Sequence, residues 1–194
     1  MEGGVVALPT ESFYSLSVDA TSAEAVDKIF AIKKRGPGLP ILILISSLGE
    51  LAKYVSAVPP AAKEMAKRFW PGGLTMIFES APILPSSLTG STGKIGIRIS
   101  SHPVAHAISQ ILSAPITGTS ANVSGMPPCT SADQVLEYLG SRLDLVLDGG
   151  PTQGKNPSTV LDVTVDPPLI IREGLISAEE IMRTGIYERL ATKG

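Results

Sequence analysis

The sequence is short of several features that would narrow its class at once. Cys129 is its one cysteine, so no disulfide can form within the chain and a reducing compartment is expected. No apolar run is long enough to cross a membrane. The first residues, MEGGVVALP, lack the charged region and long apolar core of a signal peptide. Together these absences predict a cytoplasmic protein that makes no membrane contact.

Familiar nucleotide and metal motifs are also absent. The sequence has no GxxxxGK[ST] phosphate loop and no GxGxxG after a strand. His102 and His106 have the spacing of two metal ligands on a helix, but no third ligand is apparent, and His102 before Pro103 fits a helix start. Cys129 follows two prolines without a neighbouring base, which favours a structural thiol over a nucleophile. No metal held by the protein is therefore expected.

Length and composition favour one globular domain. A chain of 194 residues, 43% of them hydrophobic and 18% charged, can bury one good-sized core. The net charge of -2 lacks the footprint of a protein that coats nucleic acid, although a local basic patch stays open. Because no repeat or linker is apparent, residues 1–194 are expected to form a single domain.

Strand and helix patterns mix along the chain. Capping-box patterns at Thr21–Glu24, Ser47–Glu50 and Ser177–Glu180 predict three helix starts, and helices are also expected over 59–69, 103–112 and 131–139. Short apolar runs predict strands over 5–8, 40–45, 74–78, 95–99, 115–118, 143–147, 159–163 and 169–172, the last two antiparallel. Residues 81–94 are expected to be a loop. The predicted fold is α/β (α+β), a twisted, mixed, open sheet with helices packed on it.

Lys33, Lys34 and Arg35 stand together before Gly36-Pro37-Gly38 and a predicted strand. Ammonium and guanidinium groups beside a glycine-rich loop can bind phosphate. The same cations also suit an ordinary helix C-terminus, where they meet the negative end of the helix dipole. The cluster alone leaves both interpretations open.

Four polar loops each follow a predicted strand, and they cover residues 9–12, 33–40, 119–125 and 149–159. In open sheets with parallel strands such loops gather at one crevice, where hydroxyl and amide groups can hold a small polar substrate and a nucleotide. Taken singly, each loop is better explained as a turn, because Ser, Asn and Gly bond to their own backbone there.

A series of motifs in a set order points to a known family. They are PTESFYSL (9–16), KKR (33–35), WPGGLT (70–75), GIRIS with HPVA (96–105), TSANVSGMPPCT (119–130), PSTVLD (157–162) and IIREG (170–174). From Gly4 to about Ile181 the chain resembles the YrdC family of threonylcarbamoyl-AMP synthases. The resemblance implies a YrdC-like fold and an enzyme.

The resemblance also implies a reaction. L-threonine, bicarbonate and ATP would give threonylcarbamoyl-AMP and pyrophosphate, and a separate transferase would pass the threonylcarbamoyl group to tRNA, forming t6A. Mg2+ would be carried by the triphosphate rather than by a protein cage. Because a carbamate oxygen attacks the α-phosphorus, the protein would supply positioning and electrostatics and no catalytic nucleophile.

Site residues are implied in the same way, by the positions that match the family motifs. The residues expected to bind threonine are Ser12, Arg98, Ser120 and Ser158. The residues expected to bind ATP are Lys33, Arg35, Asn122, Thr130 and Arg172.

Three positions depart from the family pattern. Ser15 replaces a usual glycine and would be strained if the backbone there needs a positive φ. Leu39 and Leu44 stand where polar residues are frequent, so two ligand contacts are expected to be missing. The chain begins at the first predicted strand, so the helix that usually precedes it, like the C-terminal domain of larger relatives, is expected to be absent.

Two other functions stay open at this point. The cations of residues 33–35 could lie on phosphates in a double-stranded RNA- or tRNA-binding protein, although the net charge and the lack of nearby aromatics argue against it. A carbamoyl-adenylate enzyme with a substrate other than threonine would accommodate the differences at Ser12, Leu39 and Leu44.

Overall fold

The computed structural model describes residues 3–36, 38–90 and 92–185, and its strands form two sheets. The four-stranded sheet has the order β7 (Thr119–Ser120), β2 (Tyr14–Ser17), β1 (Val6–Pro9), β8 (Leu145–Val146). The six-stranded sheet has the order β10 (Leu169–Arg172), β9 (Thr159–Asp162), β4 (Leu74–Glu79), β5 (Lys94–Arg98), β3 (Ile43–Leu44), β6 (Ile116–Thr117). Each sheet mixes parallel and antiparallel pairs. The predicted mixed α/β class is confirmed, with two sheets where one was expected.

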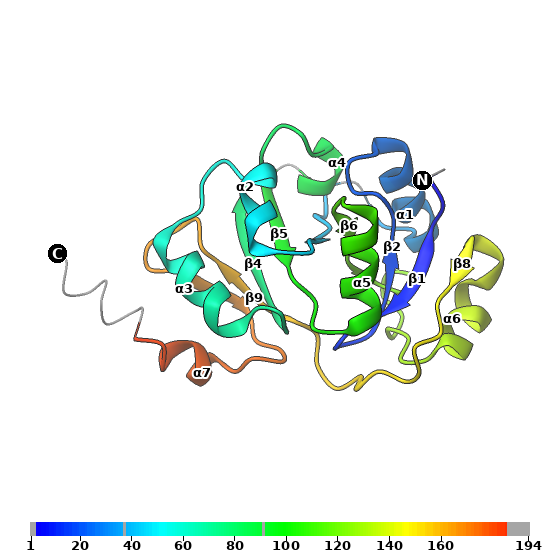
Figure 1. The fold of residues 1–194 in the computed structure, drawn as a ribbon. Helices are drawn as coiled ribbons and strands as arrows, with labels where there is room; N and C mark the ends of the chain where they lie inside the picture. The colour runs from blue at the N-terminus through cyan, green and yellow to red at the C-terminus, as the bar shows by residue number, and fades with distance from the viewer. Residues whose placement is uncertain (1–2, 37, 91, 186–194) are drawn as a thin grey trace.

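Helices pack around these sheets (Figure 1). They are α1 (Ala23–Lys33), α2 (Leu51–Tyr54), α3 (Pro60–Phe69), α4 (Ser86–Thr89), α5 (Pro103–Leu112), α6 (Ala132–Leu139) and α7 (Ala178–Met182), with 3-10 turns at Leu48–Glu50 and Gly140–Arg142. In Figure 1, α3 and α7 lie at one end of the molecule and α6 with β8 at the other. Across residues 3–36, 38–90 and 92–185, no helix has the length and apolar character needed to span a membrane.

One apolar core joins the two sheets. Ala7 and Leu16 of the smaller sheet belong to the same buried cluster as Ile97 and Leu161 of the larger one. Burying a large aliphatic side chain stabilises the folded state by about 1.5–3 kcal/mol, so this shared cluster holds the sheets together. A second cluster packs Ala105 of α5 against residues of both sheets, including Leu8, Leu44 and Ile116.

The predicted capping boxes have mixed outcomes. The box at Ser177 is confirmed, with Ser177 and Glu180 each accepting from the other's backbone N–H. The box at Thr21 is wrong by one residue, because Ser22 caps α1 while Thr21 is bonded to Asp19. At 47–50 the Ser47 side chain makes no capping bond; Glu50 instead accepts from the N–H and hydroxyl of Ser46.

Several strands and loops also differ from expectation. The run 40–45 pairs only over β3, and the loop expected over 81–94 contains the short helix α4. Strand β7 lies in the polar loop expected over 119–125, and β2 lies where no strand is predicted. The antiparallel pairing of β9 with β10 is confirmed. Pro37, part of the predicted glycine-rich loop, and residues 186–194 of the predicted domain lie outside the described residues.

The chain crosses from the smaller to the larger sheet between β8 and β9, and we call residues 149–157 the inter-sheet segment. It is bonded to the four-stranded side at several points. The Tyr14 hydroxyl donates to the Gly150 carbonyl at 2.9 Å and accepts from the Gly149 N–H at 3.3 Å. The Thr152 and Gly154 N–H groups donate to the carbonyls of Thr130 and Ser12.

Replacing Tyr14 with phenylalanine is expected to lower the free energy of unfolding by about 1–3 kcal/mol, because it leaves two backbone groups of the inter-sheet segment without their partner. Chemical denaturation measures the loss. Tyr138→Phe, at an exposed position on α6, is the matched control and should change stability by less than about 0.5 kcal/mol. Equal effects of the two substitutions would contradict the anchoring role of Tyr14.

Candidate functional site

A cavity of about 290 Å³ lies between the two sheets. The smaller sheet and its turns contribute Thr10, Ser12, Phe13, Tyr14, Ser15, Thr119 and Ser120 to its lining. The larger sheet and its flanking residues contribute Thr75, Ile77, Gly96, Arg98, Gly118, Ser158, Val160 and Arg172. Arg35, Pro40, Ile41, Leu42 and Pro157 complete it.

Two glycines keep this space open. A Cβ on Gly96 would lie 3.2 Å from the side chains of Leu42 and Thr75. A Cβ on Gly118 would lie 2.4 Å from Leu42 Cδ1, well inside van der Waals contact. Larger residues at either position would therefore push Leu42 or fill the cavity.

Arg98, at the end of β5, is the most buried cation of the lining, with 3% of its surface exposed. Its Nη1 lies 3.0 Å from Glu11 Oε1, and the other Glu11 oxygen accepts from the Ser100 hydroxyl. Burial lowers the pKa of Arg98, and the charge of Glu11 opposes that shift. Nη1 is thus paired with Glu11 through charge, and the buried Nε of Arg98 has no hydrogen-bond acceptor among the described residues. Because Arg98 lines the cavity, its guanidinium charge favours an anionic group there.

Two further guanidinium groups border the same space. Arg172 donates to the Ser158 carbonyl from Nε and Nη2, at 3.3 and 2.9 Å. Burial, and next the charge of Arg98, lowers the pKa of Arg172. Arg35 donates to the carbonyls of Leu39 and Pro40. The lining residues include no carboxylate side chain, so the cavity favours an anionic ligand.

Lys33 lies behind the cavity instead of lining it. Its buried ammonium donates to the carbonyl of Ser120, and to the carbonyl and side-chain oxygen of Asn122 at 3.0 and 2.7 Å. Burial, with a smaller effect from the charge of Arg35, lowers the pKa of Lys33 to about 8. Lys33 therefore fixes the loop that follows β7.

Six of the residues expected at the site come together around the cavity: Ser12, Arg35, Arg98, Ser120, Ser158 and Arg172. The other expected residues, Lys33, Asn122 and Thr130, do not belong to the lining. Asn122 joins Lys33 to the Ser120 hydroxyl. The N–H and hydroxyl of Thr130 both donate to the side chain of Gln134 on α6.

The structure shows the surroundings of the three residues that depart from the family pattern. Ser15 lies in β2, where its backbone pairs with Ser120 and its hydroxyl donates to the Thr119 carbonyl at 3.1 Å. The described non-glycine residues with positive φ are Lys34 and Ser113, so the condition for strain at Ser15 is not met. Leu39 is exposed and Leu44 is buried in the second core cluster, and neither lines the cavity.

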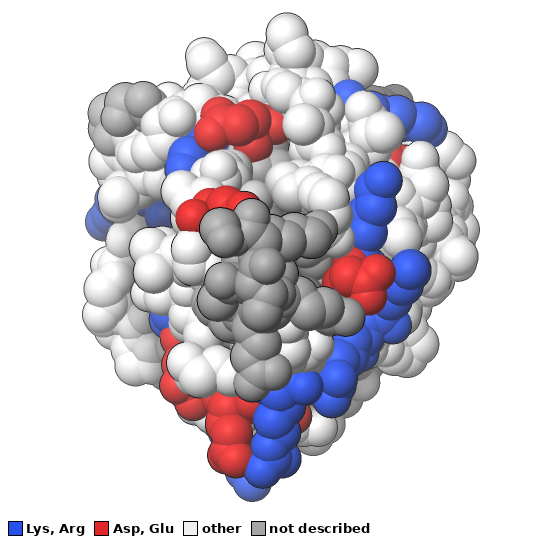
Figure 2. Space-filling view, turned by 90° about the vertical axis from the view of Figure 1, so that its left-hand side faces the viewer, with Lys and Arg blue, Asp and Glu red and all other residues white. Residues whose placement is uncertain are grey.

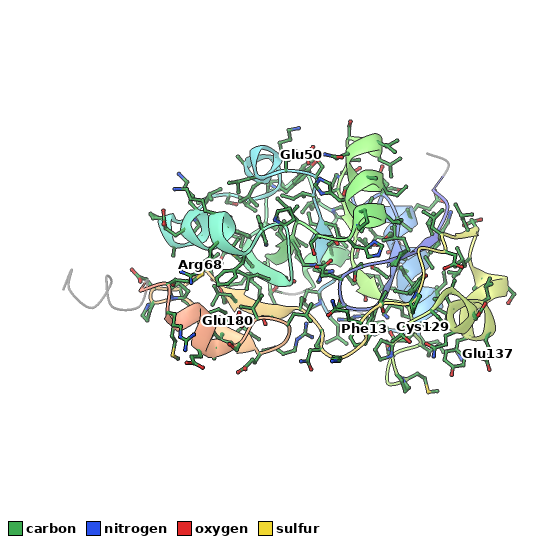
Figure 3. All side chains as sticks on the ribbon, turned by 60° about the horizontal axis from the view of Figure 1, so that its bottom comes forward. Phe13, Glu50, Arg68, Cys129, Glu137 and Glu180 are labelled. Atoms are coloured by element: carbon green, nitrogen blue, oxygen red, sulfur yellow. The ribbon has the colours of Figure 1, made fainter. Side chains whose placement is uncertain are left out.

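His102 and Cys129 have structural surroundings. The Nδ1 atom of His102 accepts from the Val104 N–H and caps α5, as its place before proline predicted. Cys129 is a buried free thiol beside the turn that carries Phe13, and its carbonyl accepts from the Tyr14 N–H (Figure 3). Burial raises the pKa of the Cys129 thiol, which disfavours the reactive thiolate.

The cations of residues 33–35 do not form one exposed basic surface, because Lys33 is buried. On the face that carries α3 and α7, Figure 2 shows a row of Lys and Arg side chains with acidic side chains beside it. Lys67 pairs there with Glu64 at 3.3 Å, and Arg68 lies close to Glu180 (Figure 3). This mixture of charges gives little support to the RNA-binding alternative.

The sequence expectations missed other polar residues of the lining, chiefly Thr10, Thr75 and Thr119. All three belong to motifs that had been singled out, in PTESFYSL, WPGGLT and TSANVSG. What the motifs lacked was the direction of each side chain, which depends on strand pairing across the cavity. Thr75, for example, pairs with Val160 of β9 and thereby points toward the same space.

Comparison with known proteins gives consistent matches along most of the chain. The family model Sua5_yciO_yrdC, described as "Telomere recombination", matches residues 1–174. The threonylcarbamoyl-AMP synthases of Pyrococcus abyssi and Bacillus subtilis are 37% and 38% identical, over 93% of this chain in both cases. The chain spans about half the length of these relatives, 53% and 52%. A putative threonylcarbamoyl-AMP synthase of Mycobacterium tuberculosis, 34% identical over 92% of this chain, is covered over 82% of its length.

Solved structures show the same similarity in three dimensions. P. abyssi Sua5 complexed with L-threonine superposes with a TM-score of 0.92 at 37% identity, over 94% of this chain and 54% of that one. Escherichia coli YciO gives a TM-score of 0.81 at 30% identity, over 90% of this chain and 84% of that one.

The buried ammonium of Lys33 predicts a dependence of stability on pH. Its pKa falls from the usual 10.5 to about 8 on folding. Between these values the folded protein has released a proton that the unfolded chain still holds, so raising the pH favours the folded state. We expect wild type to gain stability relative to Lys33→Met from about pH 8 to pH 10.5 in urea unfolding. Parallel stability curves through that window would contradict the shift.

Proposed function

Because the chain belongs to the Sua5–YciO–YrdC family, we propose that it is an L-threonylcarbamoyl-AMP synthase, a nucleotidyltransferase that joins L-threonine, bicarbonate and ATP. The observation that carries the proposal is the buried Arg98 guanidinium, which borders a cavity lined with hydroxyl groups. A zwitterionic hydroxy-amino acid supplies both the carboxylate and the polar groups that such a cavity requires.

In this proposal L-threonine lies between the two sheets. Arg98 receives its carboxylate, and the hydroxyl groups of Ser12, Ser120 and Ser158 contact its polar groups. Phe13, Ile77 and Val160 supply apolar lining against which the threonine methyl group can pack. The binding of L-threonine by a structural relative with a TM-score of 0.92 supports threonine as the ligand.

ATP occupies the open side, where Arg35 and Arg172 neutralise phosphate charge. The loop that carries Ser120 and ends at Thr130 is held in place by residues outside the lining, namely Lys33, Asn122 and Thr130. Mg2+ prefers oxygen ligands, and the lining offers hydroxyl and carbonyl groups without a carboxylate. The ion therefore enters on the triphosphate, whose oxygens supply its charged ligands.

The reaction needs three partners held in line. The amine of threonine adds to bicarbonate and water leaves, which gives a carbamate. A carbamate oxygen then forms a bond to the α-phosphorus of ATP while the bond to pyrophosphate breaks. The guanidinium groups stabilise the negative charge that develops on the phosphates, so rate enhancement comes from positioning and electrostatics.

The product is a mixed anhydride and therefore labile, so an enzyme that uses it must act soon after it is formed. A separate threonylcarbamoyl transferase takes it up and modifies tRNA to t6A. We accordingly propose a cytoplasmic location, where tRNA and ATP are available.

The test is mass spectrometry of the purified protein incubated with ATP, Mg2+, bicarbonate and L-threonine and quenched rapidly. We expect threonylcarbamoyl-AMP with an equal amount of pyrophosphate. Reactions without threonine, or with L-serine or L-valine in its place, serve as controls. Product formed without threonine, or better with another amino acid, would replace the proposal with a carbamoyl-adenylate enzyme of different specificity.

A variant pair tests the role of Arg35. We expect Arg35→Gln to weaken ATP binding by about 1.5–3 kcal/mol, the usual value of a hydrogen bond to a charged group. Lys34→Gln removes an equal charge from the neighbouring exposed position and should change affinity far less. Isothermal calorimetry with Mg-ATP measures both. Equal losses in the two variants would mean that only net charge matters.

A further inference from the structure

Thr75 stands in a row of polar side chains that crosses four neighbouring strands. The sheet order β10-β9-β4-β5 places Arg172, Ser158, Thr75 and Arg98 side by side along the larger-sheet wall of the cavity, with Ser158 directly before β9. Thr75 is 2% exposed, and the proposed function gives it no role. A buried hydroxyl in such a row must have a partner, and that partner is informative.

The partner of Thr75 is Ser158. The Thr75 hydroxyl donates to Ser158 Oγ at 2.9 Å, and Arg172 Nη2 approaches the same oxygen at 3.5 Å. A serine hydroxyl has two lone pairs and one proton. Because both approaching groups are donors, the Ser158 oxygen accepts from them and its own proton is left for a ligand.

The hydroxyl groups on the opposite wall use their protons within the protein, so they offer a ligand acceptors and not donors. Lys33 and Met126 fix the orientation of the Asn122 amide, so Ser120 Oγ must donate to Asn122 Oδ1 at 2.8 Å. Ser120 is thereby left with lone pairs for a ligand. The Thr10 hydroxyl donates to the Phe13 carbonyl at 2.7 Å.

Ser12 follows the same rule. Since the Thr10 proton is already used, the 3.1 Å contact between the hydroxyls of Thr10 and Ser12 has Ser12 as donor. Both smaller-sheet serines therefore offer acceptors, which suit an amine or hydroxyl of a ligand. Ser158 offers a donor beside the cations, which suits a carboxylate.

We propose that Thr75 is a positioning residue for substrate recognition: it turns the Ser158 hydroxyl so that its proton faces the carboxylate of the bound amino acid. The inference rests on the proposed function, because it names L-threonine as the ligand. Thr75 acts through Ser158 and makes no hydrogen bond to the substrate itself. Without the Thr75 hydroxyl, Ser158 is free to rotate and donate elsewhere.

A double-mutant cycle tests this coupling through the dissociation constants of L-threonine and Mg-ATP, measured by calorimetry on the full chain. We expect Thr75→Val to weaken threonine binding about tenfold and to leave ATP binding within about twofold. Thr75→Ser keeps the hydroxyl and should restore threonine affinity. Ser158→Ala should cause a similar loss, and Thr75→Val should add nothing to it in the double variant.

Thr117→Val is the matched control, since Thr117 is equally buried but does not line the cavity. It should lower the thermal midpoint without changing threonine affinity. Additive losses from Thr75→Val and Ser158→Ala would mean that Thr75 contacts the substrate directly and would overturn the positioning role, as would an unchanged affinity in Thr75→Val. Failure of the wild-type protein to bind L-threonine would instead refute the proposed function.

Discussion

The ion pair between Glu11 and Arg98 links the two halves of the structure. Glu11 lies in the turn after β1, in the smaller sheet, and Arg98 ends β5 in the larger one. A buried pair of this kind adds little net stability, because the cost of removing both charges from water offsets their attraction. Losing one partner is far more harmful, at about 3–5 kcal/mol, since the other is left buried and uncompensated. The pair thus constrains how the two walls face each other, together with the apolar core that the sheets share.

The three adjacent cations illustrate how one sequence pattern serves different ends. Lys33 turns inward and holds the loop of Ser120 and Asn122, Lys34 ends α1 with a left-handed backbone, and Arg35 borders the cavity. Helix termination accounts for Lys34. Arg35 is the member of the cluster that lines the cavity, and phosphate binding there stays a prediction.

Much of the architecture could be predicted from the sequence, and the failures have physical causes. The apolar runs of β4, β5 and β9 and the capping box of α7 are local signals, and they led to the right elements. Strands β2 and β7 were missed because their serines and threonines look like loop residues until they pair with each other. The division into two sheets depends on long-range pairing that periodicity does not encode.

The candidate site shows the same limit. The motifs led to residues that meet at one cavity, including Arg98, Ser120 and Ser158. They could not distinguish a residue that lines the cavity from one that lies behind it, as Lys33 and Asn122 do. The positive charge of Lys33 suggested phosphate, but three nearby protein oxygens already surround its ammonium group.

The inter-sheet segment is fixed at several points along its path beside the cavity. It runs from one wall to the other, and its hydrogen bonds to Tyr14, Thr130 and Ser12 hold it in register. Gly154 has φ +63°, and a Cβ there would lie 2.5 Å from Thr130 Cγ2, so the path of the segment leaves no slack. The length of the segment is therefore matched to the distance between its hydrogen-bonded anchors and β9. An insertion or deletion within it would have to be accommodated between these fixed points, beside Pro157 and Ser158 of the cavity lining.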